Sequence, residues 1–243
     1  MLHACTLTSE PQLNPNDPYA SLSQSDVYLQ MGIQYMGQGM LEIALTNLNH
    51  AVELDGNNSE VYNALGVLHD RLRRYDAADG YFQKAIAING ENYSARNNLG
   101  RYLCERGRHH EGMAQFQQVI AAPLYPQPWV PLTNAGLCAE GANQRKEAEE
   151  FFRKALERNP RFPPALLEMA KLSLASREYL SARGFLQRYQ NAASDSPASL
   201  WVGAQTEMAL GGSESAQSYL AKLRRQFPDS QEARMAEKLG GAY

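Results

Sequence analysis

The sequence predicts an all-α protein built as a solenoid of about six helix-turn-helix repeats, with twelve to thirteen helices and no sheet. Three observations carry this prediction. One pattern of small and large apolar residues recurs about every 34 residues, from Ser25 almost to the end of the chain. Glycine and proline turn signals recur at the same spacing. No stretch of about 20 apolar residues occurs, so the sequence as given contains no candidate transmembrane helix.

The clearest copy of the repeat, residues 59–92, reads SEVYNALGVLHDRLRRYDAADGYFQKAIAINGEN. Small residues let its two helices approach closely, and large residues fill the space between them. The small ones are Gly66, Ala78 and Ala85, and the large ones are Tyr62, Leu65, His69 and Phe82. This spacing is similar to the tetratricopeptide (TPR) repeat of 34 residues. The resemblance implies a right-handed superhelix whose first helices line a concave groove.

The chain is predicted to begin with a flexible leader and to end with a short polar cap. Residues 1–24 contain three prolines among polar residues and lack helical periodicity, so we interpret them as the leader. Ser25 is the expected N-cap of the first helix. The repeats follow at residues 25–58, 59–92, 93–126, 129–162, 163–196 and 197–230, and residues 231–243 form the cap.

The phase of the pattern slips by two residues between the third and fourth repeats. The slip lies in a segment that contains Pro123, Pro126 and Pro128. Proline has no amide hydrogen and disfavours helix for the residue before it, so this segment should end one helix and form an extended link.

Composition and motifs indicate a binding protein rather than an enzyme. The formal net charge is −3 and no long basic run occurs, which argues against a nucleic-acid partner. No CxxC, HExxH, GxSxG or Walker motif is present, and too few residues lie outside the repeats to build a catalytic domain. His69 falls at a core position, and His109-His110 falls in a turn or at a helix start. We therefore expect no catalytic site, metal, cofactor or small-molecule substrate.

Cys104 and Cys138 fall on neighbouring first helices. Packed helices generally lie roughly 8–10 Å apart, whereas a disulfide needs Cα atoms within about 7 Å. This comparison favours two free thiols, although an oxidising compartment would permit a disulfide.

Groove positions of the first helices supply the candidate binding residues. Leu29, Ile33 and Met36 form an apolar stripe in the first repeat and are the expected main contact, unless the leader or cap covers them. Asn63 and Asn97 share one position in consecutive repeats, where an amide can bond an extended peptide backbone. Two further groove residues are Arg101 and Trp201.

The start of the sequence resembles the end of a bacterial lipoprotein signal. Leu2-His3-Ala4-Cys5 has a Leu and a small residue before the Cys that would receive lipid. A working signal also needs a charged start and an apolar stretch, and only Met1 precedes these residues. We therefore expect the natural start to lie upstream. The competing interpretation is that Cys5 is an incidental thiol.

Several segments together resemble the PilF/PilW type IV pilus biogenesis proteins. They are NNLGRYLCERGRHHEG at 97–112, APLYP at 122–126 and LLEMAKLSLASREYLSARGFLQRY at 166–189, in addition to Cys5 and the repeats. The resemblance implies an outer-membrane lipoprotein facing the periplasm, anchored through Cys5. It also implies a pilotin, which binds the secretin subunit of the pilus system and promotes its localisation and multimerisation. The alternative is a general TPR scaffold without a secretin role.

Overall fold

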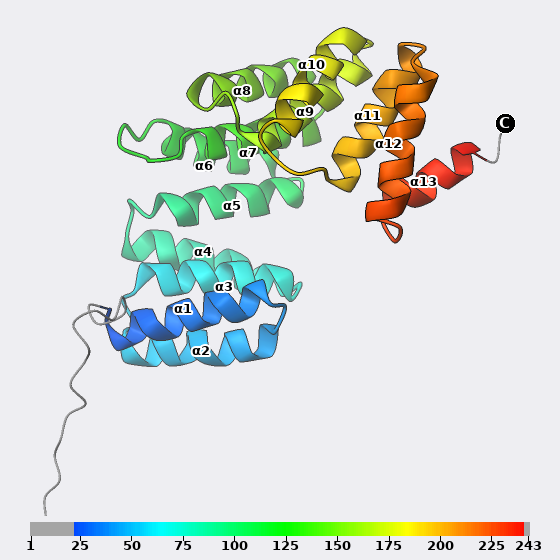
Figure 1. Cartoon of the computed structure of the whole chain (residues 1–243). Coiled ribbons are helices and arrows are strands. Elements are labelled where there is room, and N and C mark those ends of the chain that lie inside the picture. The colour runs from blue at the N-terminus through cyan, green and yellow to red at the C-terminus, as the bar shows by residue number, and fades with distance from the viewer. Residues whose placement is uncertain (1–21, 241–243) are drawn as a thin grey trace, which may run out of the picture. The chain divides into compact units, whose positions relative to one another are not determined.

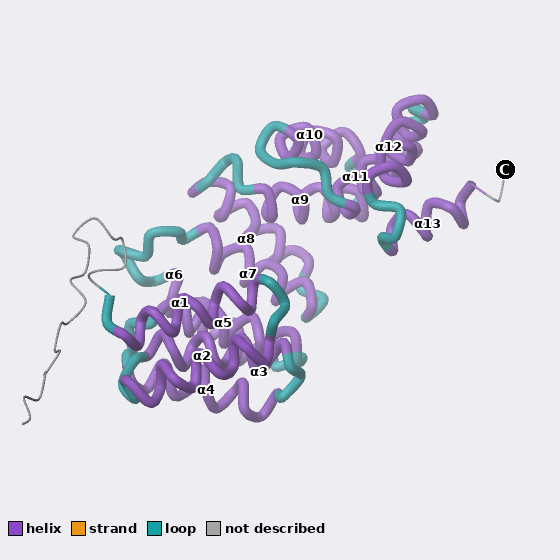
Figure 2. Tube along the Cα trace, turned by 60° about the horizontal axis from the view of Figure 1, so that its bottom comes forward, coloured by secondary structure: helices purple, strands orange, loops and turns teal. Residues whose placement is uncertain are grey.

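The computed structural model describes residues 22–240, which form helices joined by short connections (Figure 1). Over these residues the structure contains thirteen helices and no strand, which confirms the all-α prediction (Figure 2). The helices are α1 (Gln24–Gly37), α2 (Leu41–Leu54), α3 (Ser59–Arg71), α4 (Tyr75–Ile88), α5 (Tyr93–Glu105), α6 (His109–Ile120), α7 (Trp129–Gly141), α8 (Arg145–Arg158), α9 (Pro163–Ala175), α10 (Tyr179–Gln190), α11 (Pro197–Ala209), α12 (Ser213–Gln226) and α13 (Gln231–Gly240). Cys5, the predicted lipidation site, lies outside the described residues.

The chain divides into two compact units, residues 1–98 and 99–243. The division falls inside α5, so the first turns of this helix belong to the N-terminal unit and its last turns to the C-terminal unit. Each unit is described by itself below.

In the N-terminal unit, two helix pairs share one core. Helix α1 packs on α2, α3 packs on α4, and α3 also contacts both helices of the first pair. Gly66 illustrates why the repeat needs a small residue, because a Cβ added there would lie 2.5 Å from Cδ1 of Phe82. The predicted core residues Ala78, Phe82 and Ala85 are completely buried. The small-and-large pattern in the sequence therefore describes the helix contacts correctly.

Buried polar side chains form hydrogen bonds where helices and successive repeats of this unit meet. The Oγ of Ser25 donates to the carbonyl oxygen of Ala51 at 3.0 Å, and 34 residues later Ser59 donates to Ala85 at 2.8 Å. The amide of Asn92 donates to Ser59 Oγ at 2.7 Å. The two serine contacts link the start of a first helix to the last turn of the second helix of the same pair, and Asn92 links the start of α5 to the start of α3. Each of these carbonyl oxygens also accepts from the amide of its helix's C-cap residue, Asp55 or Asn89, so the serine adds a second hydrogen bond at the helix end.

The N-cap of α1 is Ser23, which corrects the prediction that Ser25 caps this helix. Ser23 accepts from the amide of Asp26, and the Asp26 carboxylate accepts in return from Ser23, which makes a capping box. Both serines are suited to capping, but only Ser23 has the Asp three residues later. Ser25 is thereby left to make its contact with Ala51.

In the C-terminal unit, the helix pairs α7 with α8, α9 with α10 and α11 with α12 repeat the same packing. Gly100 and Gly136 lie against the rings of Phe116 and Phe152, as Gly66 lies against Phe82. Helix α6 ends at Ile120 and α7 begins at Trp129, so the proline-containing segment ends the helix as predicted, but it forms turns rather than an extended link. Helix α13 packs on α11 and α12 through its buried residues Ala233 and Ala236.

His69 is a core residue, which confirms its predicted position. It is 8% exposed, and its ring lies 4.9 Å from that of Tyr81. Neither ring nitrogen has a hydrogen-bond partner. Burial, assisted by the nearby charge of Arg74, lowers the pKa of His69 below its usual value.

Candidate protein-binding face

One position of each first helix is exposed or half-buried in both units. Counted from the start of each predicted repeat it is the ninth residue, and we call the surface that these residues line the first-helix face. In the N-terminal unit it carries Ile33 and Val67, and in the C-terminal unit Arg101, Leu137, Lys171 and Gln205. Ile33 and Leu137 are each 44% exposed, whereas the other four residues are half-buried. Each unit therefore presents an aliphatic contact.

Leu29 and Met36, predicted to be exposed with Ile33, are buried. They are 5% and 6% exposed and belong to the core that α1 shares with α3. The prediction was wrong because the neighbouring first helix covers these flanking positions, leaving only the middle of the stripe open. Ile33 is the one member of the predicted stripe that a partner could touch without unfolding the repeat.

Asn63 and Asn97 are also buried, at 8% and 9% exposed. The Oδ1 of Asn63 accepts from the amide of Asn98 at 2.9 Å, which joins α3 to the first half of α5. The amide nitrogen of Asn63 lies 3.4 Å from a carboxylate oxygen of Glu60. The predicted use of both asparagines as exposed contacts for a peptide backbone is therefore wrong. The short polar side chain of Asn63 serves helix packing because α5 lies directly against it.

Cys104 and Cys138 form a disulfide between α5 and α7, with Cα atoms 5.3 Å apart. The preference for two free thiols was wrong because it used the distance between helix axes. Each Cα stands about 2.3 Å off its axis, so residues that face each other across packed helices approach to roughly 3.5–5.5 Å. Gly112 of α6 lies against the other side of α5, where a Cβ added to it would collide with the sulfur of Cys104.

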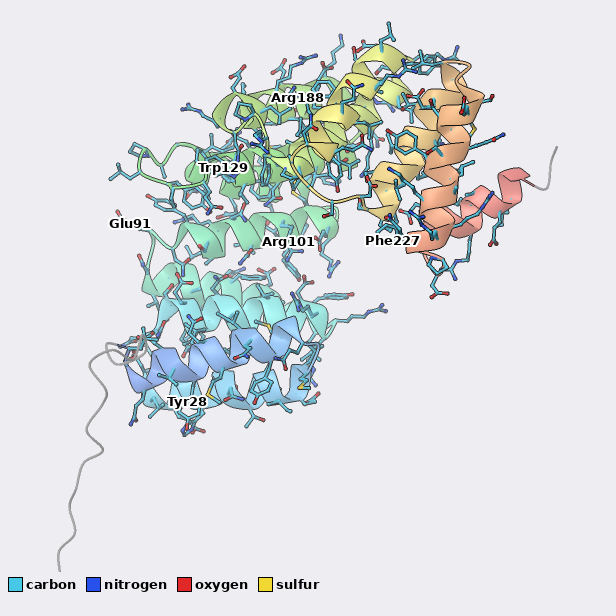
Figure 3. The ribbon with its side chains drawn as sticks, in the orientation of Figure 1. Tyr28, Glu91, Arg101, Trp129, Arg188 and Phe227 are labelled. Carbon is cyan, nitrogen blue, oxygen red and sulfur yellow. A yellow bond between two sulfur atoms is a disulfide. The ribbon has the colours of Figure 1, made fainter. Side chains whose placement is uncertain are left out.

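A pocket of about 290 Å³ lies on the first-helix face beside this disulfide. Its lining residues come from α5 and α7 and are Arg101, Cys104, Glu105, Asn134, Leu137, Cys138 and Gly141. Figure 3 labels Arg101 on α5. The guanidinium of Arg101 pairs with the carboxylate of Glu105 one turn away at 2.6 Å. The pocket therefore combines an apolar, sulfur-containing lining with a polar rim whose two charges oppose each other.

Other charges on the C-terminal unit are likewise matched within the chain. Lys171 pairs with Glu168 at 2.8 Å on α9. Arg183 of α10 donates two hydrogen bonds, at 2.7 and 2.6 Å, to the carboxylate of Glu207 on α11. Burial, and then the charge of Glu168, raise the pKa of the Glu140 carboxyl above its usual value. Of the two ion pairs, Arg183–Glu207 joins neighbouring helices and Lys171–Glu168 lies within one helix.

Trp201 and the paired histidines complete the set of predicted residues. Trp201 is half-buried and packs against the core cluster formed by α11, α12 and α13, so only part of its ring faces solvent. His109 and His110 are the first two residues of α6, where the sequence placed them. Within residues 22–240, no group of three potential ligands could hold a metal ion.

The two units differ in charge. Residues 1–98 contain 11 acidic and 5 basic side chains, and residues 99–243 contain 15 acidic and 18 basic ones. The N-terminal unit is therefore acidic and the C-terminal unit mildly basic. None of the described helices is long and apolar enough to cross a membrane.

Sequence reasoning missed most of the pocket lining, in particular Asn134, Leu137 and Gly141. Leu137 occupies in the fourth repeat the position of Ile33 in the first, so periodicity could have located it. The pocket itself depends on the disulfide, which spacing alone did not predict.

Comparisons with known proteins agree with this geometry. Family models described as tetratricopeptide repeat match residues 59–92, 94–122 and 139–201. The stacked helix pairs and the exposed first-helix face define a TPR protein, a class whose members bind other proteins.

More specific relatives belong to the type IV pilus system. The chain is 30% identical over 207 residues to the type IV pilus assembly protein PilF of Pseudomonas aeruginosa, covering 85% of this chain and 82% of PilF. The solved structure of P. aeruginosa PilF has a TM-score of 0.76 at 28% identity, covering 90% of this chain and 98% of that one. The crystal structure of PilW is described as that of a widely conserved type IV pilus biogenesis factor. It also has a TM-score of 0.76 at 28% identity, covering 87% of this chain and 97% of PilW. The chain belongs to the PilF/PilW family of TPR proteins.

Proposed function

We propose that this protein is a pilotin of a type IV pilus system, an outer-membrane lipoprotein that faces the periplasm and binds the secretin subunit. Its role is to promote secretin localisation and multimerisation. The observation that supports this proposal best is the 30% identity with PilF over 85% of the chain. A match over 207 residues spans far more than one generic helix pair.

The mechanism requires binding energy and no chemical step. Acyl chains on Cys5 hold the repeats beside the outer membrane, since stable anchoring generally needs more than one chain. The first-helix face then binds a secretin segment. Holding that segment at the membrane raises its local concentration, so that subunits meet and assemble more readily. The exposed contacts available for this step are Ile33, Leu137 and the accessible part of Trp201.

Localisation is tested by expressing the gene from its natural start in the native organism. Membranes are fractionated and the mass of the N-terminal peptide is determined. A lipidated Cys5 in the outer-membrane fraction is the expected result. Cys5→Ser should move the protein out of that fraction. An unmodified Cys5 in wild-type protein would contradict the anchored part of the proposal.

The secretin role is tested in a deletion strain. Loss of heat-resistant secretin multimers and of twitching, restored by the wild-type gene, is the expected result. Unchanged multimers in the deletion strain would contradict the pilotin assignment and would favour a general TPR scaffold.

A further inference from the structure

The pocket between α5 and α7 is large enough to take a side chain of a partner. Its volume of about 290 Å³ lies just below the roughly 300–1,000 Å³ of pockets that enclose whole small ligands. Both disulfide sulfur atoms belong to residues that line it, and Leu137 stands beside them with 44% of its surface exposed. A large side chain inserted here would cover apolar atoms that now face water.

The charges around the pocket argue for an uncharged occupant. Arg101 and Glu105 face each other at 2.6 Å, so the rim has no net charge. Asn134 adds an uncharged side chain to the lining. A charged side chain would lose water on entry without finding an unmatched charge of opposite sign.

The disulfide determines whether the pocket exists in this form. Cys104 lies on α5 and Cys138 on α7, and their bond holds the two sides of the pocket together. Dithiothreitol would reduce the bond by supplying two electrons and two protons, giving two thiols and its own cyclic disulfide. The two sulfur atoms would then separate to at least van der Waals contact, which changes the pocket lining directly.

We propose that this disulfide-lined pocket binds one uncharged apolar side chain, aliphatic or aromatic, of an extended partner segment, and only in the oxidised protein. Polarizable sulfur makes favourable contacts with aromatic rings, so the lining accepts both kinds of anchor. The inference deepens the proposed function. It rests on that function in one respect, which is that the partner is the secretin.

The first experiment needs no secretin. Random peptides displayed on phage are selected on the oxidised full chain, and the enriched sequences are synthesised. We expect them to share an uncharged apolar residue with no consistent charge beside it. Their affinity should fall by at least about tenfold for Leu137→Glu, the size expected when one anchor contact is lost. Leu137→Met should bind as the wild type does. The matched control is Leu180→Glu, because Leu180 is 72% exposed on α10, away from the pocket lining.

Oxidation dependence is measured with the same peptides. Dithiothreitol, or the double variant Cys104→Ala with Cys138→Ala, should weaken binding to the level of Leu137→Glu. Circular dichroism establishes whether each variant is folded. If the double variant does not fold, Leu137→Glu alone tests whether the peptides bind in the pocket. Binding that survives reduction of the disulfide would overturn the oxidation requirement.

Three results would overturn the pocket assignment. Selection could enrich no peptide, or enriched peptides could bind Leu137→Glu as tightly as wild type. The chain could also form a dimer that Leu137→Glu dissociates, which would assign the pocket to a second copy.

Purified secretin periplasmic domains are the ligand in a separate second experiment. Secretin binding unaffected by Leu137→Glu refutes the pocket and leaves the pilotin role standing, whereas pocket-dependent peptides without secretin binding refute the pilotin role alone.

Discussion

The two units contain the same repeat but differ in the residues that connect neighbouring helices. In the N-terminal unit, Ser59 and Asn92 form a buried hydrogen-bonded link, and Ser25 begins the preceding link in the same way. In the C-terminal unit, Pro163 and Pro197 begin the first helices at comparable positions, and a disulfide ties α5 to α7. The packing positions of the TPR repeat are thus common to both units, whereas the linking residues are free to vary.

This difference is accompanied by a difference in the exposed face. The N-terminal unit presents Ile33 and Val67 without a pocket beside them among the described pockets. The C-terminal unit presents Leu137 at the edge of the disulfide-lined pocket. The two exposed aliphatic residues, Ile33 and Leu137, can be compared by substitutions made in parallel in the two units.

The largest expected effect is one that the units share. Phe82→Ala and Phe152→Ala each remove a completely buried ring that lies against a glycine of the paired helix. Each should lower the free energy of unfolding by about 3–5 kcal/mol. Urea unfolding followed by circular dichroism provides the measurement, with Leu180→Ala as the exposed control. A large difference between the two phenylalanine variants would contradict the equivalence of their packing.

The next largest effect on the free energy of unfolding is expected in the C-terminal unit alone. Replacing Cys104 and Cys138 together by Ser should lower the free energy of unfolding by about 2–4 kcal/mol, because the unfolded chain gains freedom without the cross-link. Alkylation of unfolded wild-type protein without reductant should leave both residues unmodified, and alkylation after reduction should label both. Labelling of both before reduction would refute the disulfide.

A smaller effect belongs to the N-terminal unit. Asn92→Ala removes the hydrogen bond to Ser59 and also the cap on the amide of Ala95 at 2.8 Å. A loss of about 1–3 kcal/mol in the free energy of unfolding is expected. Asn57→Ala, at an exposed residue of the preceding turn, is the matched control. Equal stability of the two variants would show that the hydrogen bonds of Asn92 contribute nothing to the free energy of unfolding.

The smallest effect is a pH dependence located in the N-terminal unit. Because burial lowers the pKa of His69 in the folded state, the unfolded chain binds more protons once the pH falls below about 6.5. His69 therefore destabilises the fold as the pH decreases from there through its folded-state pKa. His69→Phe should reduce the loss of unfolding free energy over that range, whereas His110→Phe, at an exposed residue, should not. Identical pH profiles for wild type and His69→Phe would contradict the buried, unpartnered ring.

Periodicity was sufficient to predict the helix pairs, because the contacts of Gly66 with Phe82 and of Gly136 with Phe152 depend on spacing within one repeat. It was insufficient for the candidate site. Whether Leu29 or Ile33 is exposed depends on how the next first helix lies, and a spacing rule contains no such information. The disulfide likewise depends on the distance between facing residues rather than between helix axes.

The central claim is that the C-terminal unit holds the partner through the pocket beside Leu137. The most direct test measures the affinity of purified secretin periplasmic domains for the oxidised wild-type chain, for Leu137→Glu and for the equivalent N-terminal variant Ile33→Glu. The account predicts at least about a tenfold weaker affinity for Leu137→Glu and a smaller change for Ile33→Glu. An affinity that Ile33→Glu weakens and Leu137→Glu leaves unchanged would contradict it.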